Sequence, residues 1–277
     1  LERLAGGEGL AVDPACPFGW AARMGARASS AFDLLRAGRW VKSEAELALQ
    51  RHANIATKAA YAAAAAELAE GMTEADLVRL CEGAHAALGL DCDVFVLFGP
   101  NAAFPHGTDS PRHLERGDIV LMDGGTASGY LSDITRTIVF DAAPTDRQRT
   151  VWNAVRDAQT AALDLVRPGA ACGDLDGAAR AVIDKRGFGP DYRLFMHRLG
   201  HGIGLEIHEE PYLVRGNAVA LQPGMTFSDE PGIYVYGELG VRLEDIVAVT
   251  ESGAEVFGPR SLSLDDPFAG HMEALRA

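Results

Sequence analysis

Residues 221–250 read LQPGMTFSDEPGIYVYGELGVRLEDIVAVT, and this stretch decides the fold because residues 115–140 repeat its order. The earlier stretch reads ERGDIVLMDGGTASGYLSDITRTIVF. In both, a glycine opens an apolar strand that ends six residues later in an acid, and a second acid opens the next strand. The first acids are Asp123 and Glu230, and the second acids are Asp133 and Glu244. Side chains on a strand alternate with a period of two, so equal offsets place the first acids on equivalent faces.

The repeat extends outward from these strands to a helix signature and a His-Gly pair. EGMTEADLVRL and then FPHG precede the first copy, and RPGAACGDLDGAA and then GHGIG precede the second. His106 and His201 are therefore the paired histidines of the two halves. A unit duplicated about a pseudo-twofold axis would bring two acids from each half to one centre. The sequence thus predicts a shared acidic site between two similar halves.

The residues expected at this centre are five potential metal ligands: Asp123, Asp133, His201, Glu230 and Glu244. Four carboxylates and one imidazole could not converge in a partly buried site unless cations offset their charge and desolvation. Oxygen-rich ligation with a single histidine suits manganese, and cobalt or zinc less distinctively. If the five side chains meet, the chain is a two-metal hydrolase.

The composition suits one soluble enzyme domain and excludes several other classes. With 25 Lys and Arg against 39 Asp and Glu, the formal charge of the 277 residues is −14. This charge argues against binding to nucleic acid or to an anionic membrane surface. No long apolar run and no basic-then-apolar leader is present. The four cysteines show no CxxC spacing, so we expect reduced thiols in a cytoplasmic protein.

Helix and strand signals predict an α+β fold with helix pairs on one face of antiparallel hairpins. Helices are expected near 43–70, 74–88, 145–166 and 173–186. Strands are expected near 93–99, 118–123, 130–140, 194–200, 204–209, 225–230 and 241–249. Residues 1–40 mix short apolar runs with Gly and Pro, and we expect them to be the end of a larger N-terminal domain lost by truncation or processing. Residues 41–277 are expected to form the catalytic domain.

Three motifs carry a family resemblance: HRLGHGIGLEIHE, DEPGIYVYGELGVRLED, and DGG followed by SDITRT. They resemble the Xaa-Pro peptidases, prolidase and aminopeptidase P, of the pita-bread metallopeptidases. The resemblance covers roughly residues 40–250. It implies a duplicated pita-bread fold, in which a curved antiparallel sheet is backed by helix pairs. Residues 1–40 are similar to the end of the creatinase-like N-terminal domain of those enzymes.

The resemblance also implies roles for individual residues in a dinuclear centre. Asp133 and Glu244 would bridge two divalent metal ions, for which the resemblance implies Mn²⁺, with Co²⁺ or Zn²⁺ as alternatives. Asp123 would complete one metal's ligands, whereas His201 and Glu230 would complete the other's. The catalytic residues would be Glu230 as general base, with His106 and His208 as contacts to substrate and intermediate. The substrate-binding or ligand-orienting residues would be His106, His197, His208, Tyr234 and Arg242.

The implied substrate is a dipeptide or short peptide with proline at its second position, cleaved by a homodimer. A dipeptidase is preferred slightly over an aminopeptidase P, and the motifs leave that choice open. Asp123 and Asp133 lie ten residues apart, where the family more often has eleven, and a shorter turn at 126–129 would absorb the difference.

Three alternatives share the fold. A methionine aminopeptidase tends to carry Gln at the position of Arg242, two residues before Glu244. His197, four residues before His201, also argues against that enzyme. A creatinase-like enzyme would lack metal ligands, and a non-catalytic binding protein would have replaced at least one. All five ligand types are retained.

Other polar residues lack such a context. His52, His85, His113 and His271 are expected to pack or to lie on the surface. Arg136 is expected to form an ion pair or to lie at a sheet edge. No Lys-Ser or Lys-Thr follows GHGIG, so these glycines do not form a nucleotide-binding loop.

Overall fold

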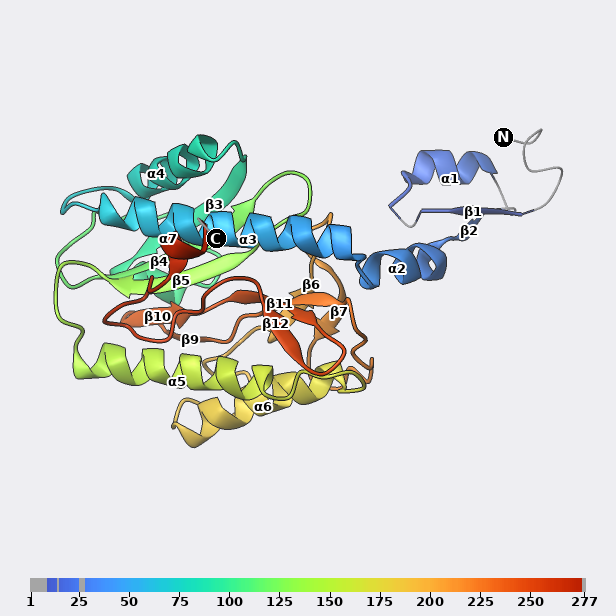
Figure 1. Cartoon of the computed structure of the whole chain (residues 1–277). Helices are drawn as coiled ribbons and strands as arrows, with labels where there is room; N and C mark the ends of the chain where they lie inside the picture. The colour runs from blue at the N-terminus through green and yellow to red at the C-terminus, as the bar shows by residue number, and fades with distance from the viewer. Residues whose placement is uncertain (1–8, 14, 25–27, 276–277) are drawn as a thin grey trace.

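The computed structural model describes residues 9–13, 15–24 and 28–275 of the chain. Its first part is a parallel pair of short strands with two helices, and Figure 1 shows most of this part extending away from the rest of the molecule. These elements are β1 (Leu10–Val12), α1 (Phe18–Met24), β2 (Ala28–Ser30) and α2 (Phe32–Trp40). That residues 1–40 end a larger domain stays a prediction, and residues 1–8, 14 and 25–27 lie outside the described part.

Four long helices follow in two pairs, close to the ranges expected from the sequence. They are α3 (Glu44–Ala66), α4 (Glu74–Ala87), α5 (Asp146–Leu163) and α6 (Cys172–Lys185). Ser43, Thr73 and Thr145 each accept a hydrogen bond from the backbone three residues later, and the side chain at that position bonds back to the cap. These capping boxes satisfy amide groups that have no partner inside the helix, which explains why the three helices begin there.

The first half forms a three-stranded antiparallel sheet in the order β3-β4-β5. Its strands are β3 (Cys92–Phe98), β4 (Ile119–Thr126) and β5 (Ile134–Val139), and the 3-10 segment η2 (Gly99–Ala103) follows β3. Gly124 in β4 has φ 118°, and a Cβ there would lie 2.2 Å from the carbonyl oxygen of Asp93. Only glycine fits this close approach, which explains the glycine directly after Asp123.

The second half contains a five-stranded sheet in the order β12-β11-β8-β6-β7 and a two-stranded β9–β10 pair, all antiparallel. The strands are β6 (Gly200–Gly202), β7 (Glu209–Leu213), β8 (Thr226–Asp229), β9 (Gly232–Val235), β10 (Leu239–Arg242), β11 (Asp245–Val249) and β12 (Ala254–Val256). A short C-terminal helix, α7 (His271–Ala274), lies against α3.

The expected strands at 194–200 and 204–209 are wrong. The backbone of residues 194–199 forms hydrogen bonds with several separate elements instead of one neighbouring strand. The carbonyl of Leu194 accepts from the amide of Tyr234, and the amide of Leu199 donates to the carbonyl of Leu213. Residues 204–208 form a loop, in which the amide of Gly204 donates to the carbonyl of Glu206. The expected strand 241–249 is divided into β10 and β11, since the backbone between them turns to pair with the first half.

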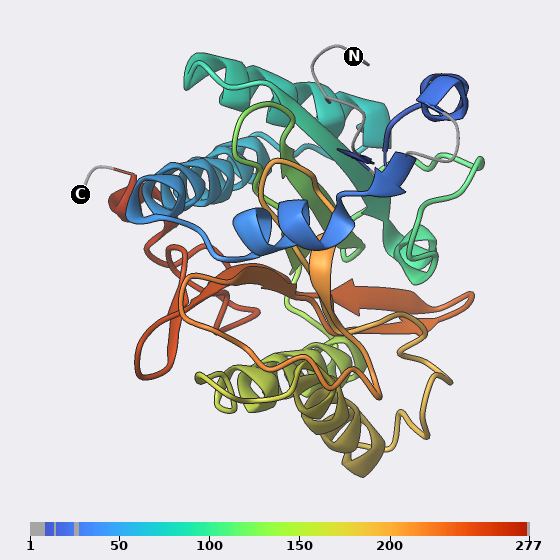
Figure 2. The same cartoon turned by 90° about the vertical axis from the view of Figure 1, so that its right-hand side faces the viewer.

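The two halves show the predicted duplication. β4 pairs with β5 as β8 pairs with β11, and the glycines before β4 and β8, Gly117 and Gly224, have φ values of 88° and 84°. The amide of Glu244 donates to the carbonyl of Thr135 at 3.1 Å, which joins the two sheets. The α3–α4 pair lies on one side of the strands and the α5–α6 pair on the other (Figures 1 and 2). This is the expected pita-bread architecture, with the acids where the halves meet.

Two large apolar clusters hold the helices to the strands. The larger contains Trp152 of α5, and the smaller contains Tyr61 of α3. Both side chains are fully buried, and the indole of Trp152 donates to the carbonyl of Thr137 at 3.0 Å. Among the described residues, no helix is long and apolar enough to cross a membrane.

Candidate metal centre and active site

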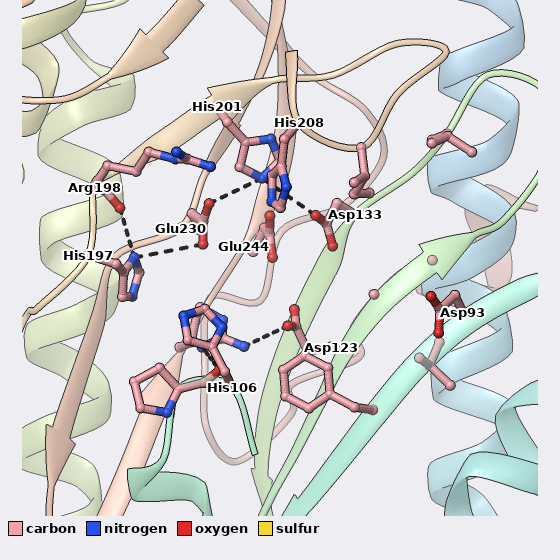
Figure 3. Close-up of a pocket in the computed structure, with 18 of the residues that line it drawn as sticks. Asp93, His106, Asp123, Asp133, His197, Arg198, His201, His208, Glu230 and Glu244 are labelled. Atoms are coloured by element: carbon pink, nitrogen blue, oxygen red, sulfur yellow. Dashed lines mark hydrogen bonds and ion pairs between the residues drawn. The ribbon is translucent and has the colours of Figure 1, made fainter. Parts of the chain in front are cut away.

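Three of the expected ligands converge at the junction of the two halves. Asp133 lies just before β5, His201 lies in β6, and Glu244 lies between β10 and β11. Each offers a ligand atom, and these atoms all lie within 4.8 Å of one another. All three residues are buried, and Figure 3 shows their side chains pointing toward a common centre.

The other two expected ligands border the same centre. Oε1 of Glu230, directly after β8, lies 3.3 Å from Nε2 of His201, and Oδ2 of Asp133 lies 3.6 Å from the same nitrogen. Asp123 projects from β4, and its Oδ2 accepts from Arg242 at 2.6 Å. All five side chains line one cavity (Figure 3).

The electrostatics of the cluster favour a bound cation. Burial is the largest effect, and together with mutual repulsion it raises the pKa values of Asp133, Glu230 and Glu244. Burial alone would lower the pKa of His201, but the neighbouring carboxylates outweigh it and raise that pKa. Ionised carboxylates at this density are costly without positive charge between them.

The hydrogen bonds around the ligands leave the right atoms available for a metal. Nδ1 of His201 donates to the carbonyl of Gly202 at 3.1 Å, so the lone pair of Nε2 faces the acids. Oε1 of Glu244 is buried and has no hydrogen-bond partner among the described residues. An imidazole nitrogen fixed in this tautomer and an unpaired buried carboxylate oxygen fit a divalent cation.

A chain of polar contacts holds Asp123 and connects it to His197. Arg242 donates to Asp123 and, at 2.7 Å, to the hydroxyl of Tyr234. Nδ1 of His197 donates to the carbonyl of Arg198, so its Nε2 accepts from the Tyr234 hydroxyl at 2.8 Å. Burial, followed by the charge of Arg242, lowers the pKa of His197 to about 3, and its imidazole is therefore neutral.

Tyr234 was expected to bind substrate or to orient ligands. Its side chain is fully buried and does not line the cavity. It lies behind Arg242 and His197, where it holds both in place. Arg242 and His197 do line the cavity.

The other two candidate histidines face the centre from opposite walls. The ring of His208 lies 4.3 Å from that of His201 in an edge-to-face arrangement. Burial, then the charges of His201 and Arg198, lowers the pKa of His208 to about 4. His106 is exposed, in the loop after η2, and lines the same cavity. Both imidazoles are therefore available to a molecule bound at the centre.

Three further residues at this site were not predicted. The hydroxyl of Thr135 contacts both Asp123 and Glu244 and accepts from Nε of Arg242. Ser228 accepts from the amide of His201 and donates to Glu230 at 3.1 Å. Arg198 lines the cavity. All three stand within two residues of a candidate ligand or contact residue, but nothing in the sequence indicates which way their side chains point.

The polar residues that were expected to pack, to form an ion pair or to lie on the surface do so. Arg136 is fully buried and pairs with Asp245 at 2.8 Å. His85 and His271 are buried and hydrogen-bonded away from the cavity, and His52 and His113 are exposed. Asp245 next to Glu244 is buried, so these two acids are not a solvated pair.

Comparison with known proteins places this site in a family. Residues 48–251 match the model of metallopeptidase family M24, and the chain therefore belongs to that family. The chain is 44% identical over 228 residues to the probable dipeptidase PepE of Mycobacterium tuberculosis, covering 81% of this chain and 60% of that protein. It is 39% identical over 231 residues to the Xaa-Pro dipeptidase of Lactobacillus delbrueckii subsp. lactis, covering 82% and 62%.

Solved structures agree with the sequence comparison. The prolidase from Pyrococcus furiosus superposes with a TM-score of 0.84 at 33% identity, covering 90% of this chain and 75% of that one. The resemblance to pita-bread metallopeptidases is thus confirmed. The chain spans about three fifths of the length of the two curated relatives, which are 60% and 62% covered.

Proposed function

We propose that the chain is the catalytic part of a two-metal peptidase that hydrolyses Xaa-Pro bonds at the N-terminus of dipeptides or short peptides. The observation that carries this proposal is the convergence of Asp133, His201 and Glu244 within 4.8 Å, with Glu230 and Asp123 beside them. Relatives named Xaa-Pro dipeptidase and prolidase support the substrate class. A dipeptidase is preferred to an aminopeptidase P.

The proposed cofactor is a pair of divalent ions, Mn²⁺ first and Co²⁺ or Zn²⁺ as alternatives. The two ions would be held by five side chains that line the cavity, those of Asp133, Glu244, Asp123, His201 and Glu230. Such ions, when bound, would acidify a water molecule and stabilise negative charge on a carbonyl oxygen. The oxygen-rich donor set with one imidazole supports manganese.

Residues of the chain would accept and donate the protons that the reaction moves. Glu230 accepts a proton as the water oxygen attacks the scissile carbonyl carbon. The C–N bond then breaks, and the leaving proline nitrogen takes up a proton. His106 and His208 contact the substrate and intermediate from the two walls, and one of them assists this protonation. Tyr234 and Arg242 hold His197 and Asp123 in position rather than reacting.

The cavity has room and an apolar wall for the proline ring. Its volume is about 840 Å³, and Phe95, Leu131 and Ile207 are among its apolar lining residues. An apolar wall beside a few convergent polar groups is typical of sites for small molecules. The extent of the catalytic domain, residues 41–277, and the homodimer stay predictions.

The test begins with protein stripped of metal by a chelator. Mn²⁺ is added back, and hydrolysis of Ala-Pro and of a longer peptide beginning Ala-Pro is measured beside calorimetric metal binding. We expect two ions bound and metal-restored cleavage of the dipeptide. Cleavage of both substrates would favour aminopeptidase P, and bound metal without cleavage of either would favour a non-catalytic protein.

The ligand assignment is tested with Asp133→Asn, which keeps the size of the side chain and removes its charge. We expect loss of metal binding and of turnover with the fold intact by circular dichroism. Asp164→Asn is the matched control, because Asp164 is exposed at the end of α5. An active variant that binds two ions would overturn the assignment of Asp133.

A further inference from the structure

His208 reaches the reaction centre from an exposed loop. The loop connects β6 to β7, and four successive residues in it, 205–208, are exposed. The ring of His208 nevertheless lies 4.3 Å from that of His201, and Figure 3 shows the two side by side. Loops with few buried contacts open at little cost in free energy. His208 therefore keeps this position only if some other group fixes the loop.

Glu209, the residue after His208, is the buried anchor of this loop. Its side chain is only 5% exposed. Its Oε1 accepts from the backbone amide of Glu206 at 3.0 Å, and a Cβ added to Gly204 would lie 3.0 Å from the same oxygen. The carboxylate thus fills the inside of the loop and is bonded to the backbone two residues before His208.

Two cations hold this carboxylate from outside the loop. Arg39 of α2 donates to Glu209 and, at 2.9 Å, to Glu206. Nζ of Lys42 lies 3.6 Å from Oε2 of Glu209. Both atoms of this second pair are buried and have no hydrogen-bond partner among the described residues. Lys42 and Glu209 therefore compensate each other's charge, and removing either charge leaves the other exposed to the cost of burial.

The cations are themselves fixed to the strand that leads to Glu230. The amide of Lys42 donates to the carbonyl of Gly224 at 2.8 Å, two residues before β8 begins. The helix that carries the arginine, α2, lies next to β7 (Figure 1). The segment before α3 thus ties the loop of His208 to the strand of the candidate general base.

We propose that Glu209 is a positioning residue for His208, and that Arg39 and Lys42 hold it in that role. The inference rests on the proposed function, in which His208 contacts the substrate and the intermediate. Glu209 does not line the cavity, so it acts through the loop and not on the substrate. One consequence is that Arg39, within residues 1–40, supports the active site directly.

The experiment measures hydrolysis of Ala-Pro by manganese-loaded protein in a double-mutant cycle. Glu209→Gln keeps the size of the side chain and removes its charge. It should lower kcat by about 10- to 100-fold, because a displacement of about 1 Å at a reacting group can cost this much. His208→Ala removes the imidazole. Since Glu209 acts through His208, adding Glu209→Gln to His208→Ala should lower kcat by less than about 2-fold.

A second measurement does not depend on activity. Hydrogen exchange of the backbone amides of residues 204–208, followed by mass spectrometry, should be faster in Glu209→Gln, because the amide of Glu206 loses its ionised acceptor. Metal binding measured by calorimetry should stay as in wild type. Glu210→Gln is the matched control, because Glu210 points to the other face of β7 and contacts Arg36 at 3.9 Å. It should retain wild-type kcat and exchange.

Additive losses in the cycle, or a wild-type kcat in Glu209→Gln, would overturn the inference. Loss of metal binding in Glu209→Gln would also overturn it, because Glu209 would then support the metal centre. If wild-type protein does not cleave Ala-Pro, the proposed function fails, and unchanged exchange in Glu209→Gln would separately refute the anchoring of the loop.

Arg39→Met covers the case in which Glu209→Gln does not fold. Its side chain is 34% exposed, and Glu209 keeps Lys42 in this variant. It should lower kcat by a smaller factor than Glu209→Gln, and only while His208 is present. An equal loss in the His208→Ala background would contradict the positioning role.

Discussion

Replacing Lys58 by methionine probes the charged cluster directly behind Glu244. Lys58 of α3 is fully buried, its ammonium donates to the carbonyl of Phe257 at 2.6 Å, and it pairs with Asp245 at 2.7 Å. Asp245 also accepts from Arg136 at 2.8 Å. The cluster thus contains two cations, Lys58 and Arg136, and one anion, Asp245. Removing one cation is therefore not equivalent to removing the anion.

The expected loss of folding free energy is about 2–3 kcal/mol, below the ~3–5 kcal/mol typical of breaking a buried ion pair. Two features lower it. Asp245 keeps Arg136, so no carboxylate is left alone. Burial lowers the pKa of Lys58 to about 8 from 10.5, so its charge is only partly compensated and methionine removes that cost. Asp245→Asn strands two buried cations and should cost more, about 4–5 kcal/mol.

The assay is urea unfolding of chelated protein followed by far-ultraviolet circular dichroism, since bound metal would add its own stabilisation. Lys185→Met is the matched control, because Lys185 is exposed at the end of α6. We expect Asp245→Asn to lose more stability than Lys58→Met. The reverse order, or a Lys58→Met variant as stable as the control, would refute this account of the cluster.

Two further substitutions test packing and pH dependence. Gly240→Ala should lower the free energy of unfolding by about 2–3 kcal/mol, because its Cβ would lie 1.8 Å from a backbone oxygen of η2. Gly177→Ala, on the open surface of a helix, should be neutral or stabilising. Thermal melts compare the two variants. Burial, then Arg136, lowers the pKa of His271 to about 4. The unfolded state therefore binds this proton first, and stability should fall by up to about 3 kcal/mol as pH drops from 6.5 to 4. In acid titrations of unfolding, His271→Gln should reduce this loss and His52→Gln should not; equal curves would contradict the assignment.

The elements whose signals are local agree with the sequence. Ser43, Thr73 and Thr145 mark helix starts because a capping box is made within four residues. The strands expected at 194–200 and 204–209 were wrong because most of these residues lie in loops. That backbone bonds to elements far away in sequence, such as Tyr234, and no local pattern reports this.

In the candidate site, too, some features follow from the sequence and others only from the folded structure. The sequence by itself predicted the duplicated order and the four acids and one histidine that line the centre, because the repeat gives the positions of the acids and the His-Gly pair gives that of His201. Only the tertiary structure decided which neighbours support them. Thr135 reaches Glu244 across 109 residues, Tyr234 is turned inward behind Arg242, and Arg198 lines the cavity. These are properties of side-chain direction and packing between the two halves, which form only when the chain has folded.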